Sequence, residues 1–164
     1  MIRDATEADL PRILAITNEA IENTTAVWSL TPATLEQRAA WFRERRAAGL
    51  PVLVAEHAGS VAGFASYAQY RPWEGYLHTV EHSLYVDPAA QGRGLGRMLL
   101  TALIAHARGE NRHVMVGGIE ASNAPSLALH ASLGFEESGT LREVGRKFDR
   151  WLDLTFVTLV LTRD

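Results

Sequence analysis

The feature that most constrains the fold is a glycine-rich run, Gln91-Gly92-Arg93-Gly94-Leu95-Gly96, between a strand-like segment (83–87) and a helix-like segment (97–108). Three glycines at alternate positions let the backbone approach a bound anion closely. The helix that follows directs its free N–H groups and the positive end of its dipole at the same place. The dipole alone contributes about 0.3–1 kcal/mol, so binding also needs amide hydrogen bonds and an arginine such as Arg97. The run therefore predicts a site for the diphosphate of a nucleotide-like ligand.

The glycine run differs from two other nucleotide-binding motifs. It lacks the Gly-Lys-Ser/Thr ending of a P-loop, so ATP chemistry is not predicted. A dinucleotide-binding fold has Gly-x-Gly-x-x-Gly after its first strand and an acidic residue about 20 positions later. Here the spacing is Gly-x-Gly-x-Gly in mid-chain, and Glu120 follows. A dinucleotide site and a glycine-rich turn without a ligand stay open as alternatives.

A second helix begins at Asn123-Ala124-Pro125-Ser126, after the next strand, and stops at Leu133-Gly134-Phe135. Asn before a helix, Pro in its first turn and Gly after its end are each ordinary helix signals. The combined order is strand, Gln91-x-x-Gly94-x-Gly96, helix, strand, Asn123-x-x-Ser126, helix and Gly134-Phe135. This order resembles the acetyl-CoA-binding core of the GNAT superfamily of N-acetyltransferases, over roughly residues 77–136.

The resemblance implies a CoA site built largely from backbone groups. The residues expected at the CoA pyrophosphate are Gln91, Gly92, Arg93, Gly94, Leu95, Gly96 and Arg97. The strand backbone expected to pair with the pantetheine arm and to polarise the thioester carbonyl is that of Leu84, Tyr85 and Val86. Asn123 and Ser126 are expected to hold the arm from the other side.

His130 stands where many members of the superfamily have a tyrosine, four residues before the Gly of the Gly-Phe pair. That tyrosine can protonate the departing thiolate. A histidine can do the same near neutral pH. His130 is therefore a candidate general acid. The alternative is a purely structural role, as a buried histidine held by a hydrogen bond.

The chain also resembles, over nearly its whole length, the phosphinothricin and methionine sulfoximine N-acetyltransferases. The matching segments are Val80-Glu81-His82-Ser83-Leu84-Tyr85-Val86, Leu129-His130-x-x-Leu133-Gly134-Phe135, Val144-Gly145-x-Lys147, Trp151-x-Asp153 and Asn23-Thr24-Thr25-Ala26-x-Trp28. In those enzymes a Glu at the position of Glu81 is the proposed base. The product is an N-acetylated α-amino acid analogue, and the usual assembly is a homodimer. Asp149 departs from the pattern, since Gly is expected there.

Glu81 is also a candidate base on chemical grounds. Acyl transfer to an amine needs a neutral nucleophile, so a group near the thioester must take the ammonium proton. Glu81 lies three residues before Leu84, on the strand expected to contact the thioester carbonyl. Partial desolvation there would raise its pKa. The alternative is a surface or ion-paired glutamate.

The expected substrate carries a carboxylate and a tetrahedral sulfone, sulfoximine or phosphinate group, which require cationic and aromatic partners. Arg71-Pro72-Trp73 follows a predicted strand, where a turn stiffened by proline could present a guanidinium to the carboxylate. Trp28, Lys147 and Arg150 are second choices. His82 and Ser83, next to Glu81, are assigned to the same pocket. The tryptophans could instead be packing residues, and the cations could be solvated.

His78-Thr79-Val80-Glu81-His82 matches the His-x-x-Glu-His pattern of inverted zincins. That motif requires a helix, in which residues four apart share one face. The β-branched residues here favour a strand, where residues four apart are about 13 Å apart. A zinc site is therefore not predicted, and no metal is expected.

Composition fits one compact enzyme domain over residues 1–164, with 47% hydrophobic residues and no cysteine. The absence of cysteine excludes disulfides and cysteine nucleophiles and fits a reducing cytoplasm. No signal peptide or membrane span is predicted. Net charge is −3, from 16 basic and 19 acidic residues, so neither nucleic acid nor a membrane is an expected partner.

The predicted fold is a mixed, mostly antiparallel α/β sheet flanked by helices. Predicted strands cover about 2–4, 52–56, 60–70, 77–86, 113–120, 135–145 and 151–161. Predicted helices cover about 6–22, 33–48, 97–108 and 123–133.

The resulting hypothesis is an acetyl-CoA-dependent N-acetyltransferase that acts on the α-amine of a small amino-acid analogue by direct transfer in a ternary complex. A different amine substrate (peptide, polyamine or aminoglycoside) and a non-catalytic CoA-binding sensor are the alternatives.

Overall fold

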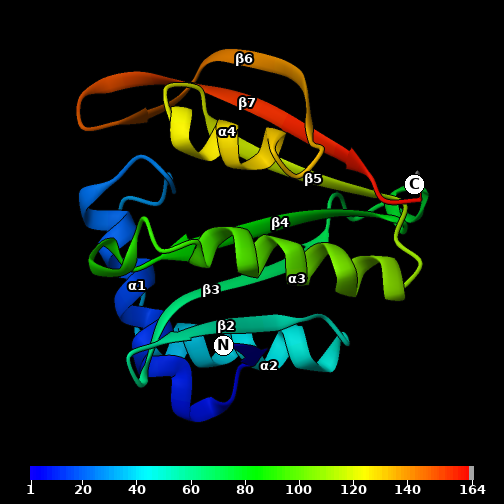
Figure 1. Cartoon of the computed structure of the whole chain (residues 1–164). Coiled ribbons are helices and arrows are strands. Elements are labelled where there is room, and N and C mark those ends of the chain that lie inside the picture. Colours follow the sequence, from blue (N-terminus) through cyan, green and yellow to red (C-terminus); the bar gives the residue numbers. More distant parts are fainter. Residues whose placement is uncertain (163–164) are drawn as a thin grey trace.

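The structure, a computed structural model, describes residues 1–162. It is built on a seven-stranded sheet in the order β1-β2-β3-β4-β5-β7-β6 (Figure 1). The strands are β1 (Ile2–Asp4), β2 (Val52–His57), β3 (Ser60–Gln69), β4 (Thr79–Val86), β5 (Val114–Glu120), β6 (Glu136–Lys147) and β7 (Arg150–Val160). Only the β4–β5 pair is parallel among these neighbours. The predicted mixed, mostly antiparallel sheet is confirmed.

Four helices flank this sheet, as predicted. They are α1 (Leu10–Asn23), α2 (Leu35–Ala47), α3 (Leu95–Gly109) and α4 (Ala124–Ala131), with single 3-10 turns at η1 (Glu7–Asp9), η2 (Glu74–Tyr76) and η3 (Pro88–Ala90). Helix α3 begins two residues before its predicted start because Gly94 is its N-cap. Within residues 1–162, none of the helices has the length and apolar character needed to cross a membrane.

Both faces of the sheet are covered, which explains the continuous apolar run in β2. Successive side chains of a strand point to opposite faces. Leu53 and Ala55 therefore join the core under α3, whereas Val52 and Val54 join the core under α1 and α2. Figure 1 shows α3 and α2 on opposite sides of the sheet. All four side chains are buried. Strand β4 lies between these two cores, so consecutive side chains of β4 reach different sides of the molecule.

Two hairpins close with two-residue turns whose residues have positive φ. In the first, Ala58 and Gly59 have φ of 50° and 78°, and they connect β2 to β3 as predicted. In the second, Phe148 and Asp149 have φ of 51° and 57° and connect β6 to β7. This geometry favours glycine, and aspartate tolerates it better than most other residues. Asp149 therefore keeps the turn that the expected glycine would form.

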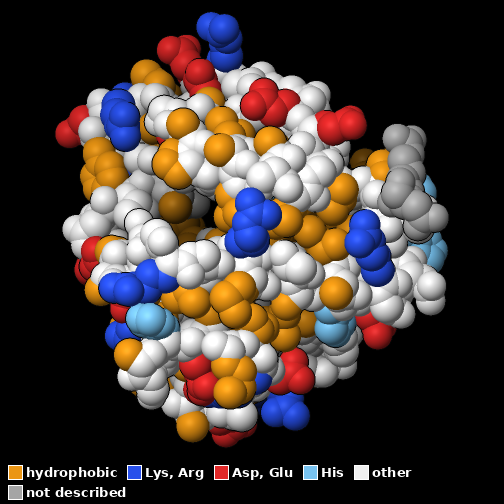
Figure 2. All heavy atoms as spheres, in the orientation of Figure 1, with side chains coloured by type: hydrophobic (Ala, Val, Ile, Leu, Met, Phe, Trp, Pro, Cys, Tyr) orange, Lys and Arg blue, Asp and Glu red, His pale blue; other side chains and the backbone are white. Residues whose placement is uncertain are grey.

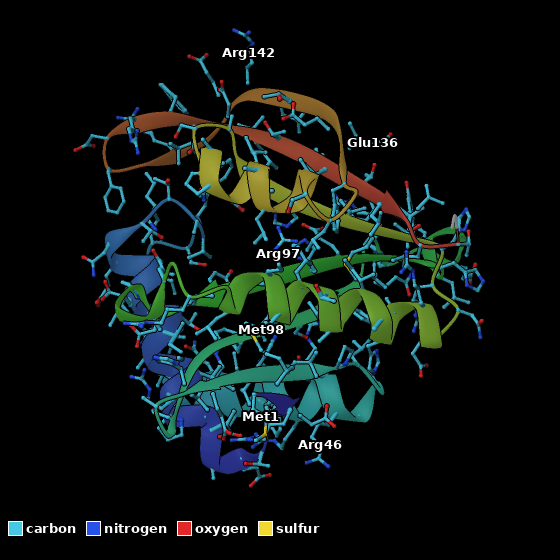
Figure 3. The ribbon with its side chains drawn as sticks, in the orientation of Figure 1. Met1, Arg46, Arg97, Met98, Glu136 and Arg142 are labelled. Carbon is cyan, nitrogen blue, oxygen red and sulfur yellow. The ribbon has the colours of Figure 1, made fainter. Side chains whose placement is uncertain are left out.

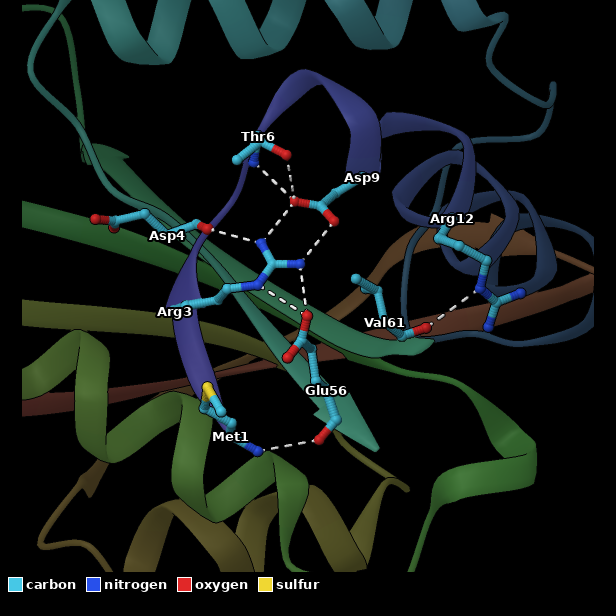
Figure 4. Close-up of polar contacts among 8 residues, drawn as sticks. All are labelled: Met1, Arg3, Asp4, Thr6, Asp9, Arg12, Glu56 and Val61. Carbon is cyan, nitrogen blue, oxygen red and sulfur yellow. Dashed lines mark hydrogen bonds and ion pairs between the residues drawn. The ribbon is translucent and has the colours of Figure 1, made fainter. Parts of the chain in front are cut away.

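An ion-pair cluster fastens β1 to its surroundings (Figure 4). Arg3 donates to both carboxylate oxygens of Asp9, at 2.8 and 2.9 Å, and to the carboxylate of Glu56 at 2.9 Å. Asp9 also accepts from the backbone N–H of Thr6 at 2.7 Å, at the start of η1. The short edge strand is thus tied to both the first helix and β2.

We expect this cluster to make stability depend on pH at acid values. The hydrogen bond from Arg3 is the main cause that lowers the pKa of Asp9 from 3.8 to about 2. A carboxyl group with a lowered pKa contributes its stability above its unfolded pKa and loses it as the pH falls through the folded pKa. The contribution is about 2 kcal/mol and should disappear between about pH 4 and pH 2.

Urea unfolding of wild type and Asp9→Asn across about pH 2–6 would measure this contribution. The variant should be less stable by about 2 kcal/mol at the upper end, and the two curves should converge at the lower end. Parallel curves would show that Asp9 is not responsible.

Candidate active site

Strands β4 and β5 are paired over only three residues and then separate. The parallel register joins Thr79 to Val114, Val80 to Met115 and Glu81 to Val116. Beyond Glu81, β4 remains paired with β3 and β5 remains paired with β7. Figure 1 shows the two strands diverging, and Figure 2 shows a hollow in the surface in that region. The backbone of β4 from His82 to Val86 therefore offers groups to which an extended ligand with amides could bind.

The glycine loop lies at the end of β4 and leads into α3. Gly92 and Gly94 have φ of 74° and 78°, a conformation that favours glycine. A Cβ atom added at either residue would have no heavy atom within 4 Å, so the space beside both is open. The first N–H groups of α3 have no partner within the helix. This geometry fits a pyrophosphate, as the sequence predicts.

The third glycine of the run, Gly96, also has a packing role. A Cβ atom on Gly96 would lie 3.3 Å from Leu129 Cδ2 of α4, so this glycine permits close packing of α3 against α4. Leu95 is buried, and only its backbone is available to a ligand. Arg97 lies between α3 and α4 (Figure 3), where its guanidinium donates to Ser132 Oγ at 2.7 Å.

On the other side of the opening, Asn123 caps α4. Its Oδ1 atom accepts a hydrogen bond from the backbone N–H of Ser126 at 3.2 Å. Pro125 lies in the first turn, as the helix signals indicate. The two residues assigned to the pantetheine arm are therefore brought together at the end of β5, across from β4.

Glu81 is the last residue of β4 that pairs with β5, so it lies where the two strands separate. Its Oε2 atom is 3.9 Å from Arg71 Nη1, and the carboxylate side chain is 38% exposed. Burial raises the pKa of Glu81, and the charge of Arg71 opposes that rise. A carboxylate of this kind can accept a proton at neutral pH.

His82 and His130 form a buried imidazole pair on the opposite face of β4. Their Nε2 atoms are 3.0 Å apart, and His130 Nδ1 is 2.7 Å from the carbonyl oxygen of Ser126. A carbonyl only accepts, so His130 Nδ1 carries the proton and His130 Nε2 accepts from His82 Nε2–H. Burial and the neighbouring His130 lower the pKa of His82 to about 3, and burial lowers that of His130. Both rings are neutral at pH 7.

This pair fits the structural explanation for His130 better than the general-acid one, because the nitrogen that carries its proton already donates to Ser126. The ring of His82 also depends on a particular neighbour. A Cβ atom on Gly117 would lie 2.8 Å from His82 Nε2, so glycine leaves the space that the ring occupies. The pair thus connects α4 to β4.

Substituting His130 by phenylalanine separates the two explanations. The change leaves a buried N–H of His82 without an acceptor, so we expect a loss of unfolding free energy of about 1–3 kcal/mol. We expect kcat, measured with saturating acetyl donor, to fall less than about 10-fold. A fall of 100-fold or more with unchanged urea stability would instead establish the acid role.

The segment after β3 presents Arg71, Pro72 and Trp73 at the surface. Arg71 lies over the ring of Tyr70, 4.1 Å from its centroid, and beside Glu81. Trp73 is 67% exposed, so most of this residue lies outside the core. Of these three predicted residues, Arg71 is the one that contacts Glu81.

Lys147 and Trp28 meet at the loop that follows α1. The ammonium of Lys147 donates to the carbonyl oxygens of Thr24 at 2.6 Å and Val27 at 2.8 Å, and the residue is buried. The ring of Trp28 packs directly on Gly145 of β6. These contacts hold the loop against the β6–β7 hairpin. Arg150, another second choice, is exposed at the start of β7.

A cavity of about 320 Å³ lies under that loop, and most of its walls are residues that the sequence patterns do not mark as site residues. It is bounded by α1, the loop after it, α2, β3 and β4. Its lining residues are Thr17, Ile21, Val27, Ser29, Thr31, Pro32, Ala33, Gln37, Arg38, Trp41, Phe64, Ser83 and Tyr85. Of these, Ser83 and Tyr85 were predicted site residues, with Tyr85 assigned through its backbone.

The His-x-x-Glu-His pattern is not on a helix. Glu81 and His82 lie in β4, as predicted, and their side chains point to opposite faces. Across residues 1–162 no three His, Asp or Glu side chains are grouped as metal ligands would be.

Comparisons with known proteins identify the family of this chain. Residues 13–135 match the acetyltransferase (GNAT) family. The chain belongs to the GNAT family of acetyltransferases. The L-methionine sulfoximine/L-methionine sulfone acetyltransferase of Pseudomonas aeruginosa is 56% identical to it, over 98% of this chain and 94% of that protein. The predicted family and the predicted enzyme class, N-acetyltransferase, are confirmed.

Two solved structures of this GNAT family extend the comparison. A phosphinothricin acetyltransferase from Sinorhizobium meliloti, in complex with acetyl-CoA, has a TM-score of 0.95 and 34% identity, covering 98% of this chain and 87% of that one. A ribosomal-protein-alanine N-acetyltransferase from Brucella melitensis has a TM-score of 0.96 and 55% identity, covering 98% and 99%. The fold is shared, whereas the named substrates differ.

Proposed function

We propose that this GNAT enzyme transfers the acetyl group of acetyl-CoA to the α-amine of a small amino-acid analogue of the methionine sulfone, methionine sulfoximine or phosphinothricin type. The observation that carries the proposal is the placement of Glu81. Its half-buried carboxylate lies beside the guanidinium of Arg71, at the point where β4 leaves β5. The proposed base and the proposed carboxylate-binding cation would then lie side by side, as an α-amino acid requires.

We propose that acetyl-CoA supplies the acetyl thioester from the opening between β4 and β5. The loop around Gly92 and Gly94, together with the first turn of α3 and Arg97, would hold its pyrophosphate. The backbone groups of residues 84–86 that face away from β3 would pair with the pantetheine arm and orient the thioester carbonyl. Asn123 and Ser126 would border the arm on the α4 side. The open space at both glycines supports this assignment.

Glu81 would act as the general base. The amine nitrogen attacks the thioester carbonyl carbon, and its proton passes to the Glu81 carboxylate, directly or through one water. The raised pKa of this group brings it closer to neutral pH, which favours proton transfer. Both substrates must be bound together for this step, so the reaction proceeds through a ternary complex without an acyl-enzyme.

The departing sulfur requires little help from the protein. When the C–S bond breaks, the electron pair stays on sulfur, and a thiol with a pKa of about 8.5 leaves readily as the thiolate. We propose that His130 and His82 position α4 against β4 for this step, since neither ring has a proton directed at a free site.

Arg71 would bind the substrate carboxylate, with Pro72 and Trp73 forming the outer wall of the pocket. Trp28 and Lys147 would act by fixing the loop after α1, and Ser83 would contact the substrate side chain beyond Glu81. The hydrogen bonds of Lys147 to Thr24 and Val27 support its role in fixing that loop.

Product identification tests the proposal. The enzyme is incubated with methionine sulfone and acetyl-CoA labelled in its acetyl group, and the product is analysed by mass spectrometry. We expect label on the α-nitrogen of methionine sulfone and one CoA thiol released per product. Intersecting initial-rate lines with both substrates varied would support the ternary complex, and parallel lines would contradict it.

A peptide with an N-terminal alanine is a second candidate substrate, favoured by the Brucella melitensis structure and its 55% identity. Such a peptide presents an α-amine but no α-carboxylate, so Arg71 would be dispensable. Loss of activity in Arg71→Met with an amino acid and not with the peptide would tell the two substrates apart.

We also propose that the enzyme is a cytoplasmic homodimer. The β6–β7 hairpin exposes four large apolar side chains, which form a candidate interface: Leu141, Val144, Phe148 and Trp151. Sedimentation equilibrium of wild type and Trp151→Glu would test this, because the variant should dissociate. A wild type that stays monomeric at micromolar concentration would contradict the dimer.

A further inference from the structure

The cavity under the loop after α1 has an unusual lining for a chain with net charge −3. None of its lining residues is acidic, and Arg38 is the only cation among them. Three aromatic rings stand in a row along one wall. Phe64 lies 6.2 Å from Trp41 and 5.3 Å from Tyr85, measured between ring centroids. The cavity is therefore suited to a compact group rich in oxygen atoms and attached to an apolar chain.

Arg38 lacks the partners that a partly buried guanidinium normally has. Its Nε atom is buried and has no hydrogen-bond partner, and the side chain forms no ion pair with a carboxylate of residues 1–162. Its guanidinium carbon lies 4.7 Å from the centroid of the Trp41 ring, a cation–π contact. A guanidinium that is removed from water and has no anionic partner favours the binding of an anion.

The cavity lies on the same face of β4 as Glu81. Residues of a strand that are two apart share a face and are about 6.6 Å apart. Ser83, which lines the cavity, therefore lies two residues beyond Glu81 on this face, and Tyr85 lies two residues beyond Ser83. In a methionine analogue, four bonds of about 1.5 Å separate the α-nitrogen from the sulfur, a span of about 5 Å. A substrate whose amine is at Glu81 can thus extend its tetrahedral group toward Ser83 and into the cavity.

We propose that Arg38 is a specificity-determining residue that binds the tetrahedral oxygen group at the end of the substrate side chain. Tyr85 of β4 contributes its hydroxyl to the same group. This inference rests on the proposed function and divides recognition between two arginines, with Arg71 at the carboxylate and Arg38 at the sulfone, sulfoximine or phosphinate group. Plain methionine has only a thioether at that place, which accepts hydrogen bonds poorly, so Arg38 favours the oxidised analogues over methionine.

The test compares kcat/KM for methionine sulfone with that for methionine, in wild type and in Arg38→Met. We expect the sulfone-to-methionine ratio to fall about 10- to 100-fold, the effect of losing a hydrogen bond from a charged group. Arg38→Lys keeps the charge and should recover part of the ratio. Tyr85→Phe removes one oxygen atom and should lower the ratio about 3- to 10-fold.

Arg45→Met is the matched control. Arg45 is on the same helix, also has a buried Nε atom without a partner, and lies 5.7 Å from the centroid of Trp41, but it does not line the cavity. It should leave the ratio unchanged while it reports any cost to stability in thermal unfolding.

Two outcomes would overturn the inference, and they are distinguishable. Equal losses for both substrates in Arg38→Met, or no loss, would show that Arg38 does not read the tetrahedral group, while the proposed function stands. A wild type that binds acetyl-CoA but acetylates no amino-acid analogue would overturn both.

Discussion

Replacing Glu81 by glutamine is expected to lower kcat for methionine sulfone by about 10²–10⁴-fold, the usual contribution of a positioned general base. The amide has nearly the shape of the carboxylate but cannot take the ammonium proton. The affinity for acetyl-CoA, measured by calorimetry, should stay within about 2-fold, because Glu81 lies where β4 and β5 separate and not at the glycine loop. Glu74→Gln, the same change at an exposed residue of η2, should have no effect.

The pH dependence offers a second readout of Glu81. A base must be ionised to act, so kcat rises as the pH increases through the pKa of Glu81, which burial places above its ordinary value of 4.5. Arg71 opposes that rise, so Arg71→Met should move the acid limb to higher pH. In Glu81→Gln this limb should be absent. An unchanged kcat in Glu81→Gln would exclude Glu81 as the base.

Replacing Gly94 by valine is expected to weaken acetyl-CoA binding about 10- to 100-fold. Gly94 has φ of 78°, which costs a β-branched residue about 1–3 kcal/mol, so the loop must shift at the start of α3. The N–H groups of that turn would then no longer converge on one anion. Calorimetric titration with CoA measures the change.

Gly49→Val is the matched control for this substitution. Gly49 has φ of +66° and open space around its missing Cβ atom, but it follows α2, away from the opening between β4 and β5. The two variants should lose similar stability in urea, and only Gly94→Val should lose CoA affinity. Equal CoA affinity in the two variants would contradict the pyrophosphate assignment.

Much of the fold was predictable from local sequence patterns. The glycine run, the Asn-x-x-Ser helix start and the Ala58-Gly59 turn each specify backbone geometry within a few residues, and all three form the structures predicted from them. At Gly96 the run has a second role that the sequence does not reveal, because a glycine required for packing against α4 looks identical in sequence to one required for an anion.

Long-range contacts were beyond the sequence patterns. His82 and His130 are 48 residues apart, and Lys147 reaches carbonyl groups more than 100 residues earlier in the chain. Arg38 is one of four arginines on α2. It lines a cavity because the loop after α1 and strand β4 pack near it, and these contacts are not visible in the sequence. A single sequence states which residues are cationic but not which of them lack an anion.

The most direct test of the central claim is CoA-thiol release from acetyl-CoA with a panel of amines. The panel contains methionine sulfone, methionine sulfoximine, phosphinothricin, methionine, glutamate, a peptide with N-terminal alanine, a lysine peptide, spermidine and an aminoglycoside. We predict rapid release with the sulfone, sulfoximine or phosphinate compounds and little with the others. Thiol release confined to a peptide, polyamine or aminoglycoside would contradict the proposed substrate. No thiol release with any amine, together with tight CoA binding, would indicate a CoA sensor.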